Sequence, residues 1–327
     1  MKIFFFILLL SSFSLKAQVL TKEECSPVDI RSSLNPELKK HFSVPRNQDS
    51  TGWCYGFSAS DLLSAHLGEP VSALHVSALY NRKARRNIFM RTAHEIGLAI
   101  SEAETRFEEV YESGLCKMAI GEAMRNGKVC HEKDLPFDYK YQDSTKEMIK
   151  DLEKIRKDRK KLSKDAICNQ IEEKLEFHGL TLDSSSISEE LVSRNMNLGI
   201  ESIANEQCKK NPMVVSPLKI KSLSLPGKSL EKRKHFLQEI GDLFKKGKPI
   251  EISYNVNKYV NYMDGLHSSV VVARRWHNNR CQYKIRNSWG KDCSLYKSNV
   301  DCEKETGSYW VNDEDFVKNT NSTTYLE

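Results

Sequence analysis

The chain has 327 residues, of which 39% are hydrophobic and 29% charged, with a formal net charge of +6 at pH 7. That is enough apolar sequence to bury a core, either in one large domain or in two modest ones. The densest basic cluster, within residues 81–91, lacks the interleaved aromatics or the known module of a nucleic-acid site. We therefore expect no nucleic-acid partner and interpret the cluster as a solvated helix face, with attraction to an anionic surface as the alternative.

The first 17 residues have the pattern of a secretory signal peptide. Lys2 precedes an apolar run over residues 3–10, and Ala17 follows a polar, serine-rich stretch. The run is too short to span a bilayer, and no other stretch is long enough, so we expect no stable membrane insertion. The pattern predicts cleavage between Ala17 and Gln18 and a secreted or periplasmic protein, with residues 18–327 as the mature catalytic domain.

The nine cysteines fit export, because an oxidising compartment permits disulfides. Apart from Cys54, eight remain, which allows as many as four bridges. We expect Cys293 and Cys302 to pair, since they flank a short polar loop that is cheap to close. No Cys-x-x-Cys pair and no histidine pair has metal-ligand spacing, so the sequence predicts neither a metal site nor a cofactor.

The stretch from Gln48 to Phe57 places Cys54 where a turn gives way to an apolar helix that ends at Gly68. The unpaired N–H groups and the positive dipole end of a first helical turn favour a thiolate. This stretch therefore predicts a thiol nucleophile. A buried or disulfide-bonded structural cysteine is the alternative interpretation.

The middle of the chain predicts more helix. His75 lies among apolar residues and is expected in the core, and Gly114 precedes a helix that ends at Gly127. Residues 140–226 are rich in Lys and Glu, with apolar residues at helical spacing and capping-box candidates that begin at Ser144 and Ser186. We interpret this region as an inserted helical subdomain with a solvated, self-pairing surface rather than a coiled-coil partner site.

The C-terminal third changes from helix to strand. An amphipathic helix over residues 230–246 precedes strands near residues 250–254, 269–273, 282–286 and 307–311. His267 stands at the mouth of one strand, and Asn287 ends another in the sequence Asn-Ser-Trp-Gly. Strand runs after helical runs predict an α+β fold.

Together these motifs resemble the papain family of cysteine peptidases. The resemblance is carried by Gln48, Gly52, Cys54 with an aromatic at Tyr55, His267, and Asn287 with Trp289 two residues later. It implies a papain-like two-lobed fold, with a helical lobe that holds the nucleophile helix and an antiparallel, barrel-like lobe that holds His267 and Asn287. The site would lie in the cleft between the lobes. Two departures are Thr51, where many relatives have a cysteine, and Trp53, where they have a small residue.

The chemistry implied is amide cleavage through a thioester, with each role assigned to one side chain. Cys54 attacks, His267 shuttles the proton, Asn287 orients the imidazole, and Trp289 shields that contact from water. Gln48 and the Cys54 N–H would form the oxyanion hole. The resemblance places substrate against Ser113, Gly114 and Ser268, although a plain turn glycine remains an alternative for Gly114.

The sequence thus predicts a secreted cysteine endopeptidase that acts as a monomer on protein or peptide substrates. Two alternatives stay open. One is a catalytically silent papain fold used for binding, and the other is a thiol acyl transferase or transpeptidase that uses the same acyl-enzyme.

Overall fold

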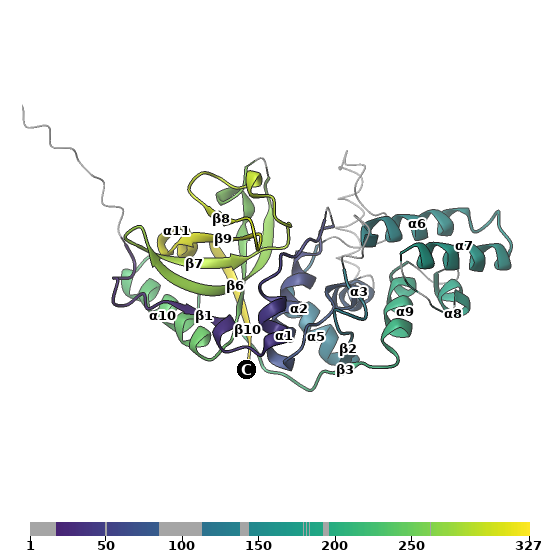
Figure 1. The fold of residues 1–327 in the computed structure, drawn as a ribbon, viewed down its shortest axis with the longest axis horizontal. Helices are drawn as coiled ribbons and strands as arrows, with labels where there is room; N and C mark the ends of the chain where they lie inside the picture. Colours follow the sequence, from purple (N-terminus) through teal and green to yellow (C-terminus); the bar gives the residue numbers. More distant parts are fainter. Residues whose placement is uncertain are drawn as a thin grey trace, which may run out of the picture.

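The computed structural model describes residues 18–49, 51–84, 113–137, 144–178, 180, 182, 184–191, 196–261 and 263–327. The predicted signal peptide and residues 85–91 of the basic cluster lie outside the described residues. Most of the described helices group on one side, and an antiparallel sheet with two helices packed on it lies on the other (Figure 1). The α+β class and the two-lobed arrangement predicted from the sequence are therefore confirmed.

The central element is helix α2, Cys54–Leu67, which is buried on nearly every side from Tyr55 to Ser64. It packs against α3 and α5 of the helical lobe and against three strands of the other lobe. As predicted, α2 ends at Gly68, whose φ of +83° suits glycine and whose N–H donates to the Ser64 carbonyl at 3.0 Å. Because α2 is buried on nearly every side, it can hold the side chain of its first residue, Cys54, between the two lobes.

The described part of this lobe also contains α1 (Pro36–His41), α3 (Ala73–Ala84) and α5 (Cys116–Asn126). Helix α5 ends at Gly127, as predicted, with a φ of +74°. A short ribbon of β2 (Lys128–Val129) and β3 (Met213–Val214) follows α5 and connects it with the return of the chain.

Four further helices extend from the helical lobe to one end of the molecule (Figure 1). They are α6 (Ser144–Asp158), α7 (Lys164–Phe177), α8 (Ser184–Glu189) and α9 (Met196–Cys208). They lie within the stretch predicted as a helical insertion. The predicted apolar faces are buried, at Met148, Leu152 and Ile155 in α6 and at Ile167, Ile171 and Leu175 in α7. Helix α8 starts at Ser184 and not at Ser186, because several consecutive serines could cap it and the sequence pattern does not rank them.

The second lobe is an eight-stranded antiparallel sheet. Its order is β4-β10-β5-β6-β7-β9-β8, with β1 added beside β6. The strands are β1 (Val28–Asp29), β4 (Ile220–Lys221), β5 (Ile250–Asn255), β6 (Leu266–His277), β7 (Arg280–Arg286), β8 (Asp301–Glu303), β9 (Ser308–Asn312) and β10 (Thr320–Leu326). Helices α10 (Leu230–Lys245) and α11 (Asp313–Asn319) pack against it (Figure 1). The predicted helix and strands of this third of the chain are confirmed.

Three disulfides join six of the nine cysteines: Cys25–Cys281, Cys130–Cys208 and Cys293–Cys302. The last confirms the predicted pair. Cys54, Cys116 and Cys168 are free. The disulfides fit a protein of an oxidising compartment. None of the helices that the structure describes has the length and apolarity to cross a bilayer.

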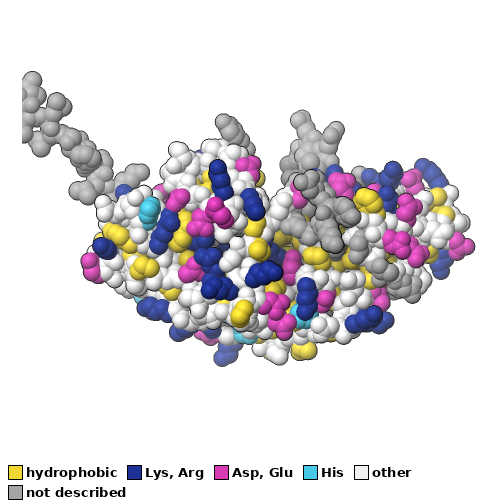
Figure 2. Space-filling view, in the orientation of Figure 1, with side chains coloured by type: hydrophobic (Ala, Val, Ile, Leu, Met, Phe, Trp, Pro, Cys, Tyr) yellow, Lys and Arg dark blue, Asp and Glu magenta, His cyan; other side chains and the backbone are white. Residues whose placement is uncertain are grey.

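Charged side chains of both signs are interspersed over the face shown in Figure 2. Several belong to local pairs, such as Lys245 with Asp242 at 2.9 Å within a helix and Lys161 with Asp158 at 3.1 Å just after one. Exposed pairs of this kind contribute little to stability, because water and salt screen them.

Candidate active site

Cys54 is the first residue of α2, and its thiol faces the start of β6. The backbone N–H groups of Ser268, Tyr55 and Cys54 itself lie near the thiol and favour its charged form. Ser268 directly follows His267, so this contact brings the thiol to the strand that carries the histidine. Among the described residues, no hydrogen bond joins Cys54 directly to the His267 ring.

Burial governs the charge state of both groups. It raises the pKa of the Cys54 thiol to about 11, against the opposing effect of the Ser268 and Tyr55 N–H groups. It lowers the pKa of His267 to about 4, although the hydrogen bond with Asn287 acts in the other direction. The prediction that the helix start lowers the thiol pKa is therefore wrong, because burial outweighs the nearby N–H groups. The neutral thiol and the neutral imidazole are the resting forms.

His267 is held by Asn287 across adjacent strands. His267 Nε2 lies 2.8 Å from Asn287 Oδ1, and both side chains are buried. The same oxygen accepts from the Ser288 backbone N–H at 2.8 Å, and Asn287 Nδ2 donates to the Tyr296 hydroxyl at 2.7 Å. A backbone N–H can only donate, so this contact fixes Oδ1 as the acceptor and places the imidazole proton on Nε2. His267 Nδ1 is then the ring atom that can accept a proton.

Trp289 covers the histidine. Its ring lies 4.1 Å from the His267 ring, centroid to centroid, at 34° between planes. Tyr254 meets another side of the imidazole edge-on at 5.5 Å. This aromatic enclosure desolvates the imidazole, which explains the lowered pKa, and it keeps water from the His267–Asn287 hydrogen bond.

Gln48 lies in a loop that pairs with the loop after Asn287. Its N–H donates to the Ser288 carbonyl at 2.8 Å, and its Oε1 accepts from the Ser288 hydroxyl at 2.6 Å. Nε2 donates one proton to the Thr51 carbonyl at 2.5 Å. An amide nitrogen carries two protons, so one N–H of Gln48 remains for a ligand. The Cys54 N–H, in the first helical turn, has no partner within the helix.

The three residues predicted to contact substrate differ in position. Ser113 is exposed, just before α5. Gly114 packs against two rings, since an added Cβ would lie 2.7 Å from Tyr80 Cε1 and 2.8 Å from Tyr55 Cδ1. Close packing alone therefore explains this glycine. The Ser268 side chain turns inward and donates to Glu251 Oε1 at 2.9 Å, while its backbone meets the thiol.

Glu251 is a charged group near the site that sequence reasoning missed. It lies in β5, is 3% exposed, and bonds the hydroxyls of Ser268 and Thr324. Burial raises its pKa to about 7, and no salt bridge reaches it among the described residues. The sequence offered one signal for this buried carboxylate, which is that Glu251 lies between Ile250 and Ile252 in a strand. In an alternating strand this position would face solvent.

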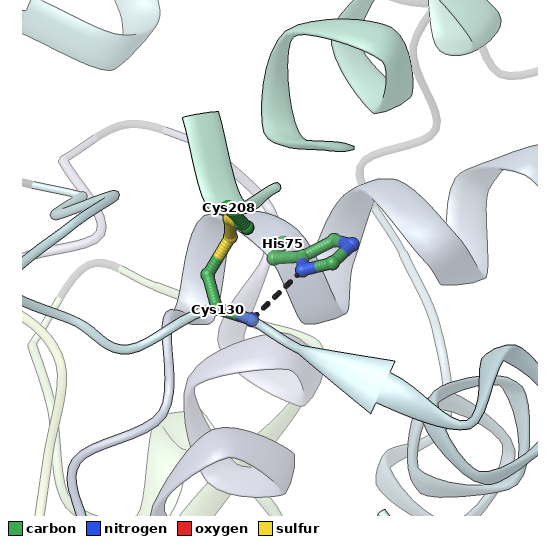
Figure 3. Close-up of side chains that lie close together, drawn as sticks. All are labelled: His75, Cys130 and Cys208. Atoms are coloured by element: carbon green, nitrogen blue, oxygen red, sulfur yellow. Dashed lines mark hydrogen bonds between the residues drawn. A yellow bond between two sulfur atoms is a disulfide. The ribbon is translucent and has the colours of Figure 1, made fainter. Parts of the chain in front are cut away.

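His75 has a structural place, as predicted. It is 2% exposed, and its Nδ1 accepts from the Cys130 N–H at 3.0 Å, next to the Cys130–Cys208 disulfide (Figure 3). Burial lowers its pKa to about 4. The three residues lie close enough to surround an ion, but both sulfurs are committed to the disulfide.

Comparison with known proteins finds only distant likeness. No family model and no curated protein matches the chain. It is similar to the structure of digestive procathepsin L 3 from Tenebrio molitor larval midgut, at 13% identity over 96% of this chain and 71% of that chain, with a TM-score of 0.42. It is also similar to the bromelain protease from Ananas comosus in complex with the E64 inhibitor, at 12% identity over 92% and 97% of the two chains, with a TM-score of 0.42.

A third similar structure is that of SERA5E from Plasmodium falciparum, at 10% identity over 94% of this chain and 98% of that chain, with a TM-score of 0.48. Likenesses at this distance carry no conclusion about chemistry. The roles of the residues have to be assigned from the geometry of this chain.

Proposed function

We propose that this chain is an exported cysteine peptidase that hydrolyses peptide bonds through a thioester on Cys54. One observation carries the proposal. Asn287 fixes the His267 ring with Nδ1 as its proton acceptor, and the backbone N–H of the residue after His267 lies near the Cys54 thiol. A thiol, a base and an orienting group in this order form a nucleophilic site.

The first half of the reaction forms the thioester. His267 Nδ1 takes the thiol proton as Sγ attacks the carbonyl carbon of the substrate, because the resting thiol is neutral. The free N–H of Gln48 and the Cys54 N–H donate to the oxygen as it gains charge. The imidazolium then gives its proton to the leaving amine, and the C–N bond breaks.

The second half releases the enzyme. A water molecule gives a proton to Nδ1 and attacks the thioester carbonyl, and the same two N–H groups stabilise the second oxyanion. Collapse expels the Cys54 sulfur, which recovers its proton from His267. Throughout, the Asn287 amide holds the ring plane and adds no charge of its own.

The protein setting fits this chemistry. The predicted signal peptide and the three disulfides support export. The cleft that the family resemblance implies between the lobes would suit an extended peptide. We propose Ser113, Gly114 and the Ser268 backbone as contacts of the peptide, and residues 140–226 as an inserted helical subdomain.

The test is peptide release from an unstructured protein such as casein, under mildly reducing conditions at pH 5–7. The wild-type chain should release peptides, and Cys54→Ala should release none. Cys168→Ala is the matched control, because Cys168 is a free cysteine on α7, far along the chain from the site. Equal release by wild type and Cys54→Ala would defeat the proposal.

A further inference from the structure

Beneath the candidate site lies a buried carboxylate, Asp61, that contacts two buried arginines. Its Oδ2 accepts from Arg286 Nε at 2.9 Å, and its Oδ1 accepts from Arg46 Nη1 at 2.7 Å. The three residues are only 3%, 2% and 6% exposed, respectively. Asp61 is on α2, seven residues after Cys54, so it lies two turns below the nucleophile on the same face of the helix.

Each arginine adjoins another residue of the site. Arg286 directly precedes Asn287, and its guanidinium also donates to the carbonyls of Val44 at 2.7 Å and His41 at 2.9 Å. Arg46 lies two residues before Gln48, and its carbonyl accepts from the Gly290 N–H at 2.8 Å. One carboxylate on the nucleophile helix therefore contacts the segments that carry Gln48 and Asn287.

None of the three disulfides joins the nucleophile helix to the segments that carry Gln48 and Asn287. Cys25–Cys281 and Cys293–Cys302 lie on the side of the sheet, and Cys130–Cys208 lies on the side of the helices. All nine cysteines are among the described residues, so no disulfide links α2 to the strand of Asn287. Between these elements the connections are side-chain packing, backbone pairing and the buried charges.

The cluster holds charges of both signs. Among the described residues, Arg46 also contacts Glu132 at 3.2 Å, so two guanidinium groups meet two carboxylates there. His41 Nε2 lies 2.9 Å from Asp61 Oδ1, and burial lowers the pKa of His41, so this histidine adds no charge at neutral pH. The two arginines hold the pKa of Asp61 well below its usual range. Loss of the Asp61 charge would leave Arg46 and Arg286 without the carboxylate that they share.

We infer that Asp61 is a positioning residue. Its carboxylate, paired with Arg46 and Arg286, sets the distance and orientation of Gln48 and Asn287 relative to Cys54. The inference rests on the proposed function for its kinetic consequence. Its geometric consequence, the alignment of His267 with the Cys54 thiol, can be measured without turnover.

The experiment compares full-length Asp61→Asn with wild type, with the disulfides intact. Asp242→Asn is the matched control, because Asp242 forms an exposed pair with Lys245. Two quantities are measured. The first is kcat and KM on a flexible peptide. The second is the rate of Cys54 alkylation by iodoacetamide at pH 6.5 divided by the rate at pH 9, mapped by mass spectrometry to separate Cys54 from Cys116 and Cys168.

For Asp61→Asn, kcat should fall at least about tenfold with KM within about threefold, since alignment affects the transition state more than binding. The alkylation ratio should fall by a similar factor, because a misaligned His267 no longer accepts the thiol proton as Sγ attacks the reagent, which is the route open to a neutral thiol at pH 6.5. The control should match wild type in both. A folded Asp61→Asn with the wild-type alkylation ratio would overturn the inference.

If Asp61→Asn does not fold, the alkylation ratio of Arg286→Lys tests the inference in its place. Lysine keeps the charge but cannot reach Asp61 and the two carbonyls at once, so the alkylation ratio should still fall. An unchanged ratio in folded Arg286→Lys would overturn the inference. If wild type hydrolyses nothing, the proposed function fails, while the alkylation ratios still test the positioning role of Asp61.

Discussion

Glu251→Gln should make the stability of the protein less dependent on pH. Burial raises the pKa of Glu251 to about 7 from an ordinary 4.5. Between these pH values the unfolded chain releases this proton while the folded chain keeps it, so this residue lowers stability as pH rises. The difference between these two pKa values corresponds to a change of about 3 kcal/mol in the free energy of unfolding, at about 1.4 kcal/mol per pKa unit. Below pH 4.5 the contribution of Glu251 vanishes, and above pH 7 its full cost is present.

Denaturant unfolding at pH 4 and pH 8, without reductant, measures this effect. The stability of Glu251→Gln minus that of wild type should be more favourable at pH 8 than at pH 4, by about 3 kcal/mol. Glutamine can keep a hydrogen bond with Ser268, so the change chiefly removes the charge. Glu305→Gln, at an exposed carboxylate, is the control and should show no such difference. A Glu251→Gln difference that is the same at both pH values would refute the reasoning.

Two further predictions concern turnover of a peptide substrate. Asn287→Ala should lower kcat by about 10²-fold to 10⁴-fold and leave detectable activity, because Asn287 orients the base and does not react. Tyr296→Phe is the control, because it removes only the hydroxyl that lies 2.7 Å from Asn287 Nδ2. If Tyr296→Phe lowered kcat as much as Asn287→Ala does, that result would speak against the orienting role of Asn287. Gln48→Ala should lower kcat by about 10²-fold to 10³-fold with little change in KM, because the Gln48 N–H bonds most strongly to the substrate oxygen when that oxygen is charged. A change confined to KM would assign Gln48 to ground-state binding.

Local sequence signals predicted much of the fold. Gly68 and Gly127 end helices because glycine adopts positive φ readily, and the alternating stretch before Asn287 forms a strand. The Cys293–Cys302 bridge followed from a short separation of 9 residues. Each of these features depends on residues close together in the chain, where the sequence pattern carries the information.

Contacts between distant segments that no family motif marks were not predicted. Asp61 and Arg286 are 225 residues apart, and Cys25 pairs with Cys281 across 256 residues. No local pattern marks either pair. The charge state of Cys54 was mispredicted for a similar reason. The helix dipole is a local property, whereas the desolvation that raises the thiol pKa arises where α2 meets β6 of the other lobe.

The central claim is that Cys54 forms a thioester that water resolves. Acid-quenched reactions with an activated peptide ester, followed by intact-mass and peptide-mapping mass spectrometry, measure this directly. We expect an acyl adduct on Cys54 that accumulates and then decays to free acid in water, and no adduct in Cys54→Ala. An adduct on another residue, or one on Cys54 that resolves only when an amine is added, would contradict the claim.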